Sequence, residues 1–361
     1  MPARIFFSLL ITLVVGLFSG RGHADVSQGP NDPGRPEAVL VVHGGAGDLS
    51  RMMLTPFERN AYRSALEEAL LAGYARLQNG DAALDAVQAA IIVLEDSPYF
   101  NAGRGAVFNS AGDIELDAAI MDGRSKEAGA VAIVQGVRNP ILLARAVKEK
   151  SGHVMLAGKG ARRFAKRQGF DLVGERYFRT DRQWRAYKRA KKARNGGVTN
   201  SNLSRDSDEQ RLTWRERKYG TVGAIARDRY GNLAAGGSTG GSFFKRPGRI
   251  GDTPIVGAGV YADNATCAVA GTGEGEFFIR LSLAYQICSE TARIGLVQSA
   301  EKAVLKDLAS LNAKGGVIAL APVGPPAAIF NTKAMFRGVI NDQGSVSIHI
   351  FADEDTSDNG L

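Results

Sequence analysis

The pair Gly220-Thr221 stands where a polar, basic stretch changes abruptly into the apolar run Val222–Ala226. A threonine freed as a new N-terminus carries nucleophile and base on one residue, because its hydroxyl attacks while its own amine takes the proton. An α-amine has a pKa of about 7.7–8.0, which suits a base working near neutral pH. A Gly-Thr dipeptide alone is common at the start of a strand, so the residues that follow must decide.

The residues after Thr221 form two apolar runs joined by a tight turn at 228–232, which predicts a β-hairpin. The second strand would return Ser238-Thr239-Gly240-Gly241 to the start of the first. A second hydroxyl, that of Thr239, is therefore expected beside Thr221. The glycines on both sides allow close approach of backbone or substrate.

Arg249 and Asp252 lie on the glycine-rich loop that follows the hairpin. An arginine binds a carboxylate in bidentate fashion and an aspartate binds an ammonium group, so the pair could clamp an amino-acid substrate. The same residues could instead form an exposed salt bridge of little energetic value. Farther on, Thr272-Gly273 could present a hydroxyl and a backbone N–H to a developing oxyanion. A phosphate-binding loop fits poorly there, because no Lys-Ser/Thr follows the glycines.

These motifs and their order resemble the plant-type L-asparaginase / isoaspartyl (β-aspartyl) peptidase family of N-terminal-nucleophile (Ntn) hydrolases, relatives of glycosylasparaginase. The resemblance implies an α/β (α+β) fold, a four-layer αββα sandwich of the Ntn-hydrolase type. It also implies an (αβ)2 homodimer of processed protomers. It spans nearly the whole chain after the leader, through the segments Val42–Gly47, Asn101–Phe108, Glu115–Ala118, Met121–Gly123, Gly129–Ala132, Arg138–Pro140, Gly220–Thr221, Ser238–Gly241, Pro247–Asp252 and Thr272–Glu276.

The resemblance assigns the nucleophile and its neighbours. Thr221 matches the nucleophile that the family releases by autocatalytic cleavage after Gly220. Thr239 matches the threonine that hydrogen-bonds the nucleophile and tunes it. Asn101 matches an asparagine close to the active site and is given a supporting role.

The substrate-binding residues are assigned in the same way. Arg249 and Asp252 match the residues that hold the α-carboxylate and α-amine of the aspartyl group. Thr272 and Gly273 match the oxyanion pair, which contributes to both catalysis and substrate binding. Catalysis needs no cofactor, but the family has a main-chain loop for a structural sodium ion, matched here by Leu94, Glu95, Ser97, Phe100, Ala102 and Arg104.

The expected function is that of an autoprocessed threonine hydrolase. It would cleave β-aspartyl (isoaspartyl) dipeptides and the side-chain amide of L-asparagine, giving L-aspartate. A glycosylasparaginase-type amidase would share the nucleophile, and an uncut, inactive homologue could act as a basic binding protein. The preference between asparagine and dipeptides stays open, with Phe243, Phe244 and Glu274 as candidates for setting the leaving-group preference.

Composition fits a globular hydrolase, with 361 residues, 44% of them hydrophobic, and a mean hydropathy of −0.12. Only four histidines occur, which argues against Ser-His-Asp catalysis, and no Cys/His cluster has zinc-site spacing. His43 opens a glycine turn and is expected to be structural. Neither nucleic acid nor membrane is expected as a partner of the mature protein.

The N-terminus has the pattern of a secretory signal, with Arg4 before the apolar stretch Ile5–Phe18 and small residues before a cleavage site after Ala24. A signal anchor is the alternative. The expected organisation is therefore a signal peptide (1–24), a flexible lead-in (25–37), an α-chain (38–220) and a catalytic β-chain (221–361). The location would be periplasmic or secreted.

Two features have open interpretations. Cys267 and Cys288 could pair in an oxidising compartment or remain buried thiols. The segment Arg179–Arg194 holds eight Lys/Arg against one acid and drives the net charge of +8. With the polar residues after it, it suggests a basic, disordered α-chain tail over about 179–220 that begins as a solvated linker helix. The alternative is a polybasic tether.

Periodicity and turn residues predict the remaining elements. Asp81 and Asn139 are expected as helix N-caps, the latter followed by Pro140 at the first helical position. Helices are predicted near 56–77, 82–95, from 140, 276–288 and 296–311, and strands near 38–43, 129–135, 255–260, 265–270, 317–321, 327–331, 335–340 and 345–351.

Overall fold

The computed structural model describes residues 36–195 and 220–354. The expected signal peptide, most of the expected lead-in and residues 196–219 of the expected tail lie outside the described residues. Residues of both expected chains belong to one unit of internal contacts, which begins at Pro36.

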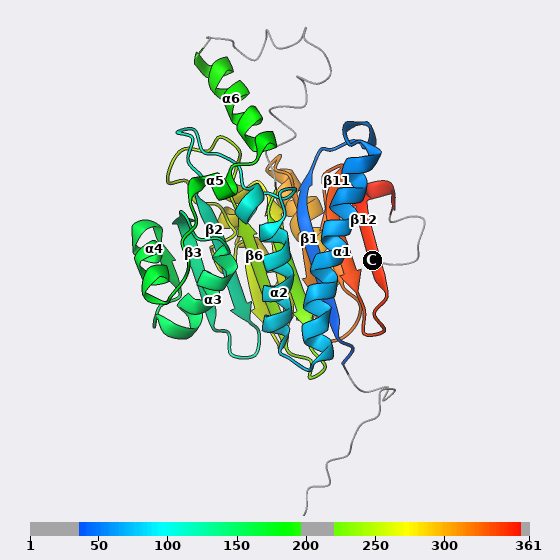
Figure 1. The fold of residues 1–361 in the computed structure, drawn as a ribbon. Helices are drawn as coiled ribbons and strands as arrows, with labels where there is room; N and C mark the ends of the chain where they lie inside the picture. Colours follow the sequence, from blue (N-terminus) through cyan, green and yellow to red (C-terminus); the bar gives the residue numbers. More distant parts are fainter. Residues whose placement is uncertain (1–35, 196–219, 355–361) are drawn as a thin grey trace, which may run out of the picture. The chain divides into compact units, whose positions relative to one another are not determined.

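The hairpin expected after Thr221 forms the middle of an eight-stranded sheet with the order β12-β11-β1-β5-β6-β2-β3-β4 (Figure 1). Its turn is closed by hydrogen bonds between Asp228 and Asn232, and Gly231 takes a positive φ of 78° there. Every pairing in this sheet is antiparallel except that of β3 with β4. The strands are β1 (Val39–Gly47), β2 (Leu116–Asp122), β3 (Ala128–Val134), β4 (Met155–Ala157), β5 (Val222–Arg227), β6 (Leu233–Thr239), β11 (Ala334–Ile340) and β12 (Val346–Phe351).

A second, four-stranded antiparallel sheet packs against the first in the order β10-β9-β8-β7. Apolar side chains of the two sheets, Ile225 and Ala270 among them, form one buried cluster between them. Because side chains alternate along a strand, one face of each central strand points into this interface. The strands are β7 (Val260–Asp263), β8 (Cys267–Gly273), β9 (Gly315–Leu320) and β10 (Ala327–Phe330).

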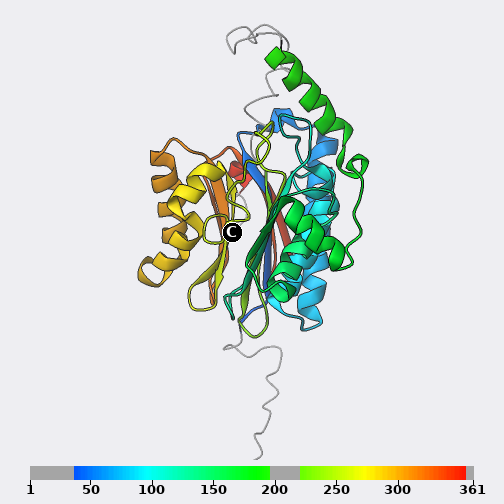
Figure 2. The same ribbon diagram turned by 90° about the vertical axis from the view of Figure 1, so that its left-hand side faces the viewer.

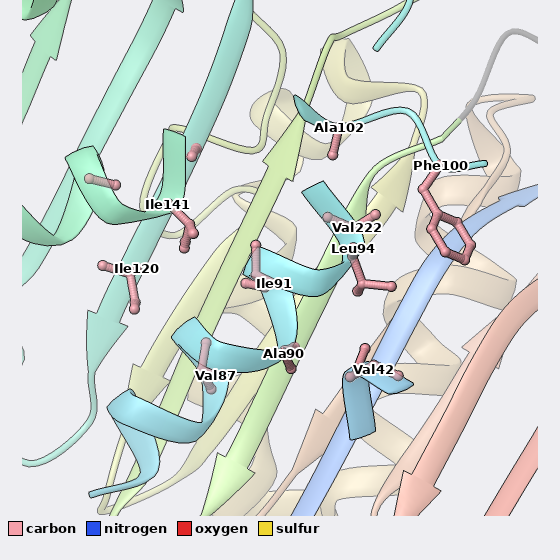
Figure 3. Packing of buried hydrophobic residues seen from close by; sticks show 14 of the residues in the cluster. Val42, Val87, Ala90, Ile91, Leu94, Phe100, Ala102, Ile120, Ile141 and Val222 are labelled. Atoms are coloured by element: carbon pink, nitrogen blue, oxygen red, sulfur yellow. The ribbon is translucent and has the colours of Figure 1, made fainter. Parts of the chain in front are cut away.

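Three long helices cover the outer face of the larger sheet: α1 (Pro56–Gln78), α2 (Ala83–Asp96) and α3 (Pro140–Lys150). Figure 3 shows α2 lying over β5 and β6, with Leu94 beside Val222. The apolar side chains on one face of the strands pack here against the apolar face of α2, and together they form the main core.

Helices also cover the outer face of the smaller sheet, namely α8 (Gly275–Leu281), α9 (Leu283–Ile294) and α10 (Leu296–Glu301). Figure 2 shows the two sheets side by side with these helices on one side and α1 to α3 on the other. The expected mixed α/β class is confirmed. The packing runs in the order helices, sheet, sheet, helices, which is the order that an αββα sandwich requires.

Helix starts follow local chemistry, with two corrections. Thr55 caps α1 as its side chain accepts from Glu58 N, while Glu58 accepts from Thr55 N. The N-cap of α2 is Ala82, one residue after the expected Asp81. Asn139 occupies the N-cap position of α3, but the side chain that accepts from Ile141 N is that of Glu95.

Other predicted elements also changed. Of the strand expected near 255–260, only the last residue lies in a strand, because 252–259 form turns that lead into β7. The helix expected at 276–288 is divided at Ser282, whose φ of 47° is left-handed. The helix expected at 296–311 continues past α10 as a π-helix, Lys302–Leu308.

The basic segment begins as a helix, as the linker-helix interpretation expected, so a disordered tail does not begin near residue 179. After α4 (Gly158–Arg167) and α5 (Glu175–Phe178) comes α6 (Asp181–Asn195). Trp184 and Tyr187 of α6 each have their ring centroids 5.4 Å from that of Phe108. One face of this helix is therefore anchored to the fold, whereas its lysines and its arginines other than Arg182 are exposed.

Cys267 of β8 and Cys288 of α9 form a disulfide, and both residues are fully buried. The sequence left open whether these cysteines pair or remain buried thiols, and the structure shows the disulfide. It fastens the smaller sheet to the helices that cover it.

Candidate active site

Thr221 lies directly before β5 with its hydroxyl against that of Thr239 at the end of β6. The Thr221 Oγ1 donates to Thr239 Oγ1 at 3.2 Å, and both residues are buried. Pairing of Val222 with Ser238 fixes this register, and alternation turns both threonines toward the space between the sheets. The expected approach of the two hydroxyls by hairpin geometry is present in the structure.

The peptide bond expected to be cut has a strongly hydrogen-bonded carbonyl. Gly220 O accepts from Asn101 Nδ2 at 2.7 Å and from Thr239 Oγ1 at 3.2 Å. A Cβ at Gly220 would come within 3.1 Å of Asn101 Cβ, and one at Gly45 within 2.9 Å of Gly220 Cα. Glycines therefore let three segments converge on this bond, and two donors polarise it.

Arg249 forms a bidentate ion pair, but with Glu276 rather than with Asp252. Its Nε and Nη2 donate to the Glu276 carboxylate at 2.9 and 2.8 Å. The remaining nitrogen, Nη1, lies toward Gly241 and Gly251, where an added Cβ would approach it to 3.4 and 2.8 Å. Glu276 thus holds the guanidinium so that Nη1 faces the loop beside Thr239.

Asp252 is buried, and burial raises the pKa of its carboxyl to about 7, although the charge of Arg249 opposes this shift. Together with Gly251, Thr253, Gly273 and the two hairpin threonines, it lines a small cavity in front of Thr221. A carboxylate in this position can bind an ammonium group deprived of water.

Two buried oxygens of the residues that line this cavity, Asp252 Oδ2 and Thr253 Oγ1, have no hydrogen-bond partner among the described residues, and neither has Thr272 Oγ1, next to the lining residue Gly273. Such groups are rare in folded proteins, and together they indicate a place for a polar ligand. Thr272 is the penultimate residue of β8, on the face turned toward the larger sheet, and the last residue, Gly273, takes a φ of 150° and lines the cavity.

A buried charge cluster supports the loop that carries Arg249. Lys245 Nζ lies 3.7 Å from Glu115 Oε2 and 4.0 Å from Asp117 Oδ2, and Glu115 Oε1 accepts from Gly248 N at 3.0 Å. Burial lowers the pKa of Lys245 and raises that of Asp117, whereas their mutual attraction acts against both shifts. This cluster ties the loop to β2.

His43 lies on β1 opposite Gly223 and is fully buried. Burial lowers its pKa to about 3, partly offset by the Thr221 backbone, so the imidazole is neutral at physiological pH. It lies on the strand next to β5, in the interior of the fold, where a structural role was expected from the sequence.

The loop from Leu94 to Arg104 folds back on itself. A Cβ at Gly103 would collide with the Glu95 carbonyl oxygen, and one at Gly105 with that of Phe100. Leu94, Phe100 and Ala102 bury their side chains in the core (Figure 3). The Glu95 side chain caps α3, and burial raises its pKa to about 8.

Comparison with known proteins identifies the family. The family model for asparaginase matches residues 36–350. The isoaspartyl peptidase of Salmonella typhimurium is 42% identical over 317 residues, covering 87% of this chain and 99% of that protein. The plant-type L-asparaginase of Pyrococcus abyssi is 43% identical over 270 residues, covering 74% and 84%. The isoaspartyl peptidase/L-asparaginase of Xenopus laevis is 40% identical, covering 86% and 95%. The chain belongs to the asparaginase family.

As a member of the asparaginase family, the protein is a hydrolase with the Ntn-hydrolase fold. None of the described helices is long and apolar enough to cross a membrane. The described residues also contain no group of three or more His, Cys, Asp or Glu arranged to hold a metal ion. A cation site formed by main-chain carbonyls does not require such a group of side chains.

The structure brings five of the residues expected from the sequence, Thr221, Thr239, Arg249, Asp252 and Gly273, to one cavity, whereas Asn101 and Thr272 are not part of its lining. No role was expected from the sequence for Thr253, which also lines the cavity, or for Glu276, which pairs with Arg249. Of the suggested leaving-group residues, Phe243 packs against α6 and Glu274 accepts from Lys314 N at 3.1 Å. The ring of Phe244 lies 5.9 Å from that of Tyr187, also on α6.

Proposed function

We propose that this protein is a threonine hydrolase that cuts itself between Gly220 and Thr221 and then hydrolyses β-aspartyl dipeptides and the side-chain amide of L-asparagine. The observation that carries the proposal is the position of the Thr221 hydroxyl at 3.2 Å from Thr239, directly after a doubly hydrogen-bonded Gly220 carbonyl. The names of the relatives, isoaspartyl peptidase and L-asparaginase, support the substrate class.

Self-cleavage begins when the Thr221 oxygen attacks the Gly220 carbonyl carbon. Negative charge then develops on Gly220 O, where Asn101 and Thr239 already donate. The C–N bond breaks, the nitrogen takes a proton, and an ester joins Gly220 to the Thr221 oxygen. Water hydrolyses this ester, giving a free carboxylate on Gly220 and a free amine on Thr221.

Turnover uses the amine that self-cleavage exposes. The amine takes the hydroxyl proton as Thr221 attacks the side-chain carbonyl of the substrate, and Thr272 and Gly273 donate to the oxyanion. Collapse of this intermediate expels ammonia or an amino acid, which receives the proton. Water then hydrolyses the β-aspartyl ester and releases L-aspartate.

The α-carboxylate and α-amine of the substrate would be held by Arg249 and Asp252, which line the cavity in front of Thr221. The α-carboxylate would bind Arg249 through Nη1, and the α-amine would bind Asp252 in its ionised form. Such a ligand would also give partners to the buried oxygens of Asp252, Thr253 and Thr272. The proposal therefore accounts for polar groups that are otherwise costly to bury.

A sodium ion fits the folded-back loop, where the main-chain carbonyls of Leu94, Glu95, Ser97, Phe100, Ala102 and Arg104 would hold it. Its role would be structural, because this loop leads directly to Asn101. Hard oxygen ligands suit such a cation, and no step of the reaction passes through it.

Export and assembly form the remaining part of the proposal. We infer a periplasmic or secreted protein, since the N-terminal sequence has a signal pattern and a buried disulfide suits an oxidising compartment. The processed protomers are proposed to pair as an (αβ)2 homodimer, as the family resemblance implies.

The test is intact mass and N-terminal sequencing of purified protein kept for a day at neutral pH. Two chains are expected, one starting Thr-Val-Gly-Ala-Ile. Assays with a β-aspartyl dipeptide and asparagine should then release aspartate, while Thr221→Ala should neither cut nor turn over. A folded chain that stays uncut would sink the proposal and favour an inactive homologue.

A further inference from the structure

A second cavity lies on the other side of the Gly220–Thr221 junction and has a volume of about 180 Å³. One wall is the glycine-rich end of β1 together with Gly220 and Asn101. The opposite wall is aromatic and includes Tyr62, Tyr99 and Phe336. This cavity has no part in the steps described so far.

Gly220 is the residue common to the linings of the two cavities. The first cavity, with Arg249 and Asp252, lies on the Thr221 side of the scissile bond, and the second lies on the Asn101 side. A substrate with its α-carboxylate at Arg249 and its reacting carbonyl at Thr221 would therefore have the second cavity available, past Gly220, for its leaving group.

The aromatic wall is rigid. The rings of Tyr62 and Phe336 stack at 4.4 Å, and Phe100 packs edge-on against Tyr62 at 5.5 Å. Tyr62 and Phe100 are buried, so these rings are fixed before any ligand enters. An apolar side chain would find a preformed surface here.

A cation, Arg182 of α6, lies at this wall. It donates to the Tyr62 hydroxyl at 2.7 Å and to the Tyr99 carbonyl at 2.6 Å, and no carboxylate of the described residues pairs with it. Glu58, the acidic residue among those that line the cavity, is engaged with the backbone and hydroxyl of Thr55, each at 2.9 Å. The guanidinium thus keeps donors available for an added anion.

We infer that this cavity binds the leaving amino acid of a β-aspartyl dipeptide, with Arg182 binding its free α-carboxylate and the aromatic wall receiving an apolar side chain. The inference rests on the proposed function and deepens it. It makes Arg182 a specificity-determining residue for dipeptides, because in a longer peptide that carboxylate is replaced by an amide. Asparagine releases only ammonia and has nothing to place there.

The test compares three substrates on fully cut enzyme: β-Asp-Leu, the same dipeptide with a C-terminal amide, and asparagine. The variants are Arg182→Gln, which removes the charge, Arg182→Lys, which keeps it, and Arg189→Ala, an exposed arginine of the same helix as a matched control. Rates are expressed per cut protomer, as measured by intact mass.

Arg182→Gln should lower the ratio of kcat/KM for β-Asp-Leu to that for asparagine about tenfold, through KM, the size expected for one charged hydrogen bond. The preference for β-Asp-Leu over its amide should shrink by a similar factor. Arg182→Lys should restore part of both ratios, and Arg189→Ala should keep them.

Two results would overturn the assignment: unchanged ratios in Arg182→Gln, or an equal loss on all three substrates, which would indicate a structural role. A wild-type protein that hydrolyses none of the three would contradict the proposed function itself.

Discussion

The side-chain amide of Asn101 donates to the carbonyl oxygen of Gly220 at 2.7 Å and to that of Gly241 at the same distance. Its own oxygen accepts from Val107 N at 3.0 Å. One amide therefore joins the loop after α2 to both ends of the proposed catalytic hairpin. It is also oriented before any charge develops on Gly220 O.

Replacing Asn101 by alanine should slow self-cleavage by about 10²–10³, the usual cost of losing one oxyanion donor. Intact mass recorded over time gives the rate. Asn264→Ala is the matched control, since Asn264 contacts Leu233 and Asn232 at the turn end of the same hairpin. Equal rates for Asn101→Ala and wild type would show that this hydrogen bond does not assist the cut.

The pH profile should reflect Asp252. Because burial raises its pKa to about 7, the carboxyl is increasingly neutral below that pH and cannot bind an ammonium group as an ion. Hence kcat/KM should fall as pH decreases through about 7. Asp252→Asn should raise KM and remove this part of the acid limb, leaving the limb due to the Thr221 amine. If the acid limb of the pH profile is unchanged in Asp252→Asn, it arises from the titration of another group.

Glu276→Gln should raise KM for asparagine about tenfold with a smaller change in kcat. The variant weakens the two-point hold on Arg249 and so disorders the guanidinium that receives the substrate carboxylate. Glu290→Gln is the matched control, because Glu290 pairs with Lys302 outside the cavity. A lower KM in Glu276→Gln would mean instead that Glu276 competes with the substrate for Arg249.

Replacing both Cys267 and Cys288 by alanine should lower the free energy of unfolding by about 3 kcal/mol, the loop-closure value for a bridge of this span. The two cysteines are 21 residues apart in sequence. Urea denaturation of the uncut Thr221→Ala protein, with and without reductant, measures the change on a single polypeptide. Equal midpoints for this protein with and without its two cysteines, both under oxidising conditions, would exclude a stabilising role.

The hairpin could be predicted from the sequence because the turn residues at 228–232 set the pairing of its two strands. This pairing alone brings Thr239 next to Thr221. Glu276 could not be assigned in this way, since its partner Arg249 comes from a distant loop. The break at Ser282 was also hidden, because the flanking residues continue an apolar helical pattern and only tertiary packing imposes the left-handed turn. Glu95 replaced Asn139 as the cap of α3 for the same reason.

The order of the larger sheet has a consequence for how the mature protein holds together. β1, which precedes the proposed cut, lies between β11 and β5, which follow it, and β2 pairs with β6 on the other side. Strands of the two products are therefore neighbours at three places in this sheet, so the products cannot separate without breaking these three pairings. Before the cut, folding is a unimolecular process. After it, reassembly would be bimolecular and dependent on concentration. Each molecule thus folds once, as a single polypeptide. After the cut, the lifetime of the folded protein depends on how slowly it unfolds rather than on repeated refolding.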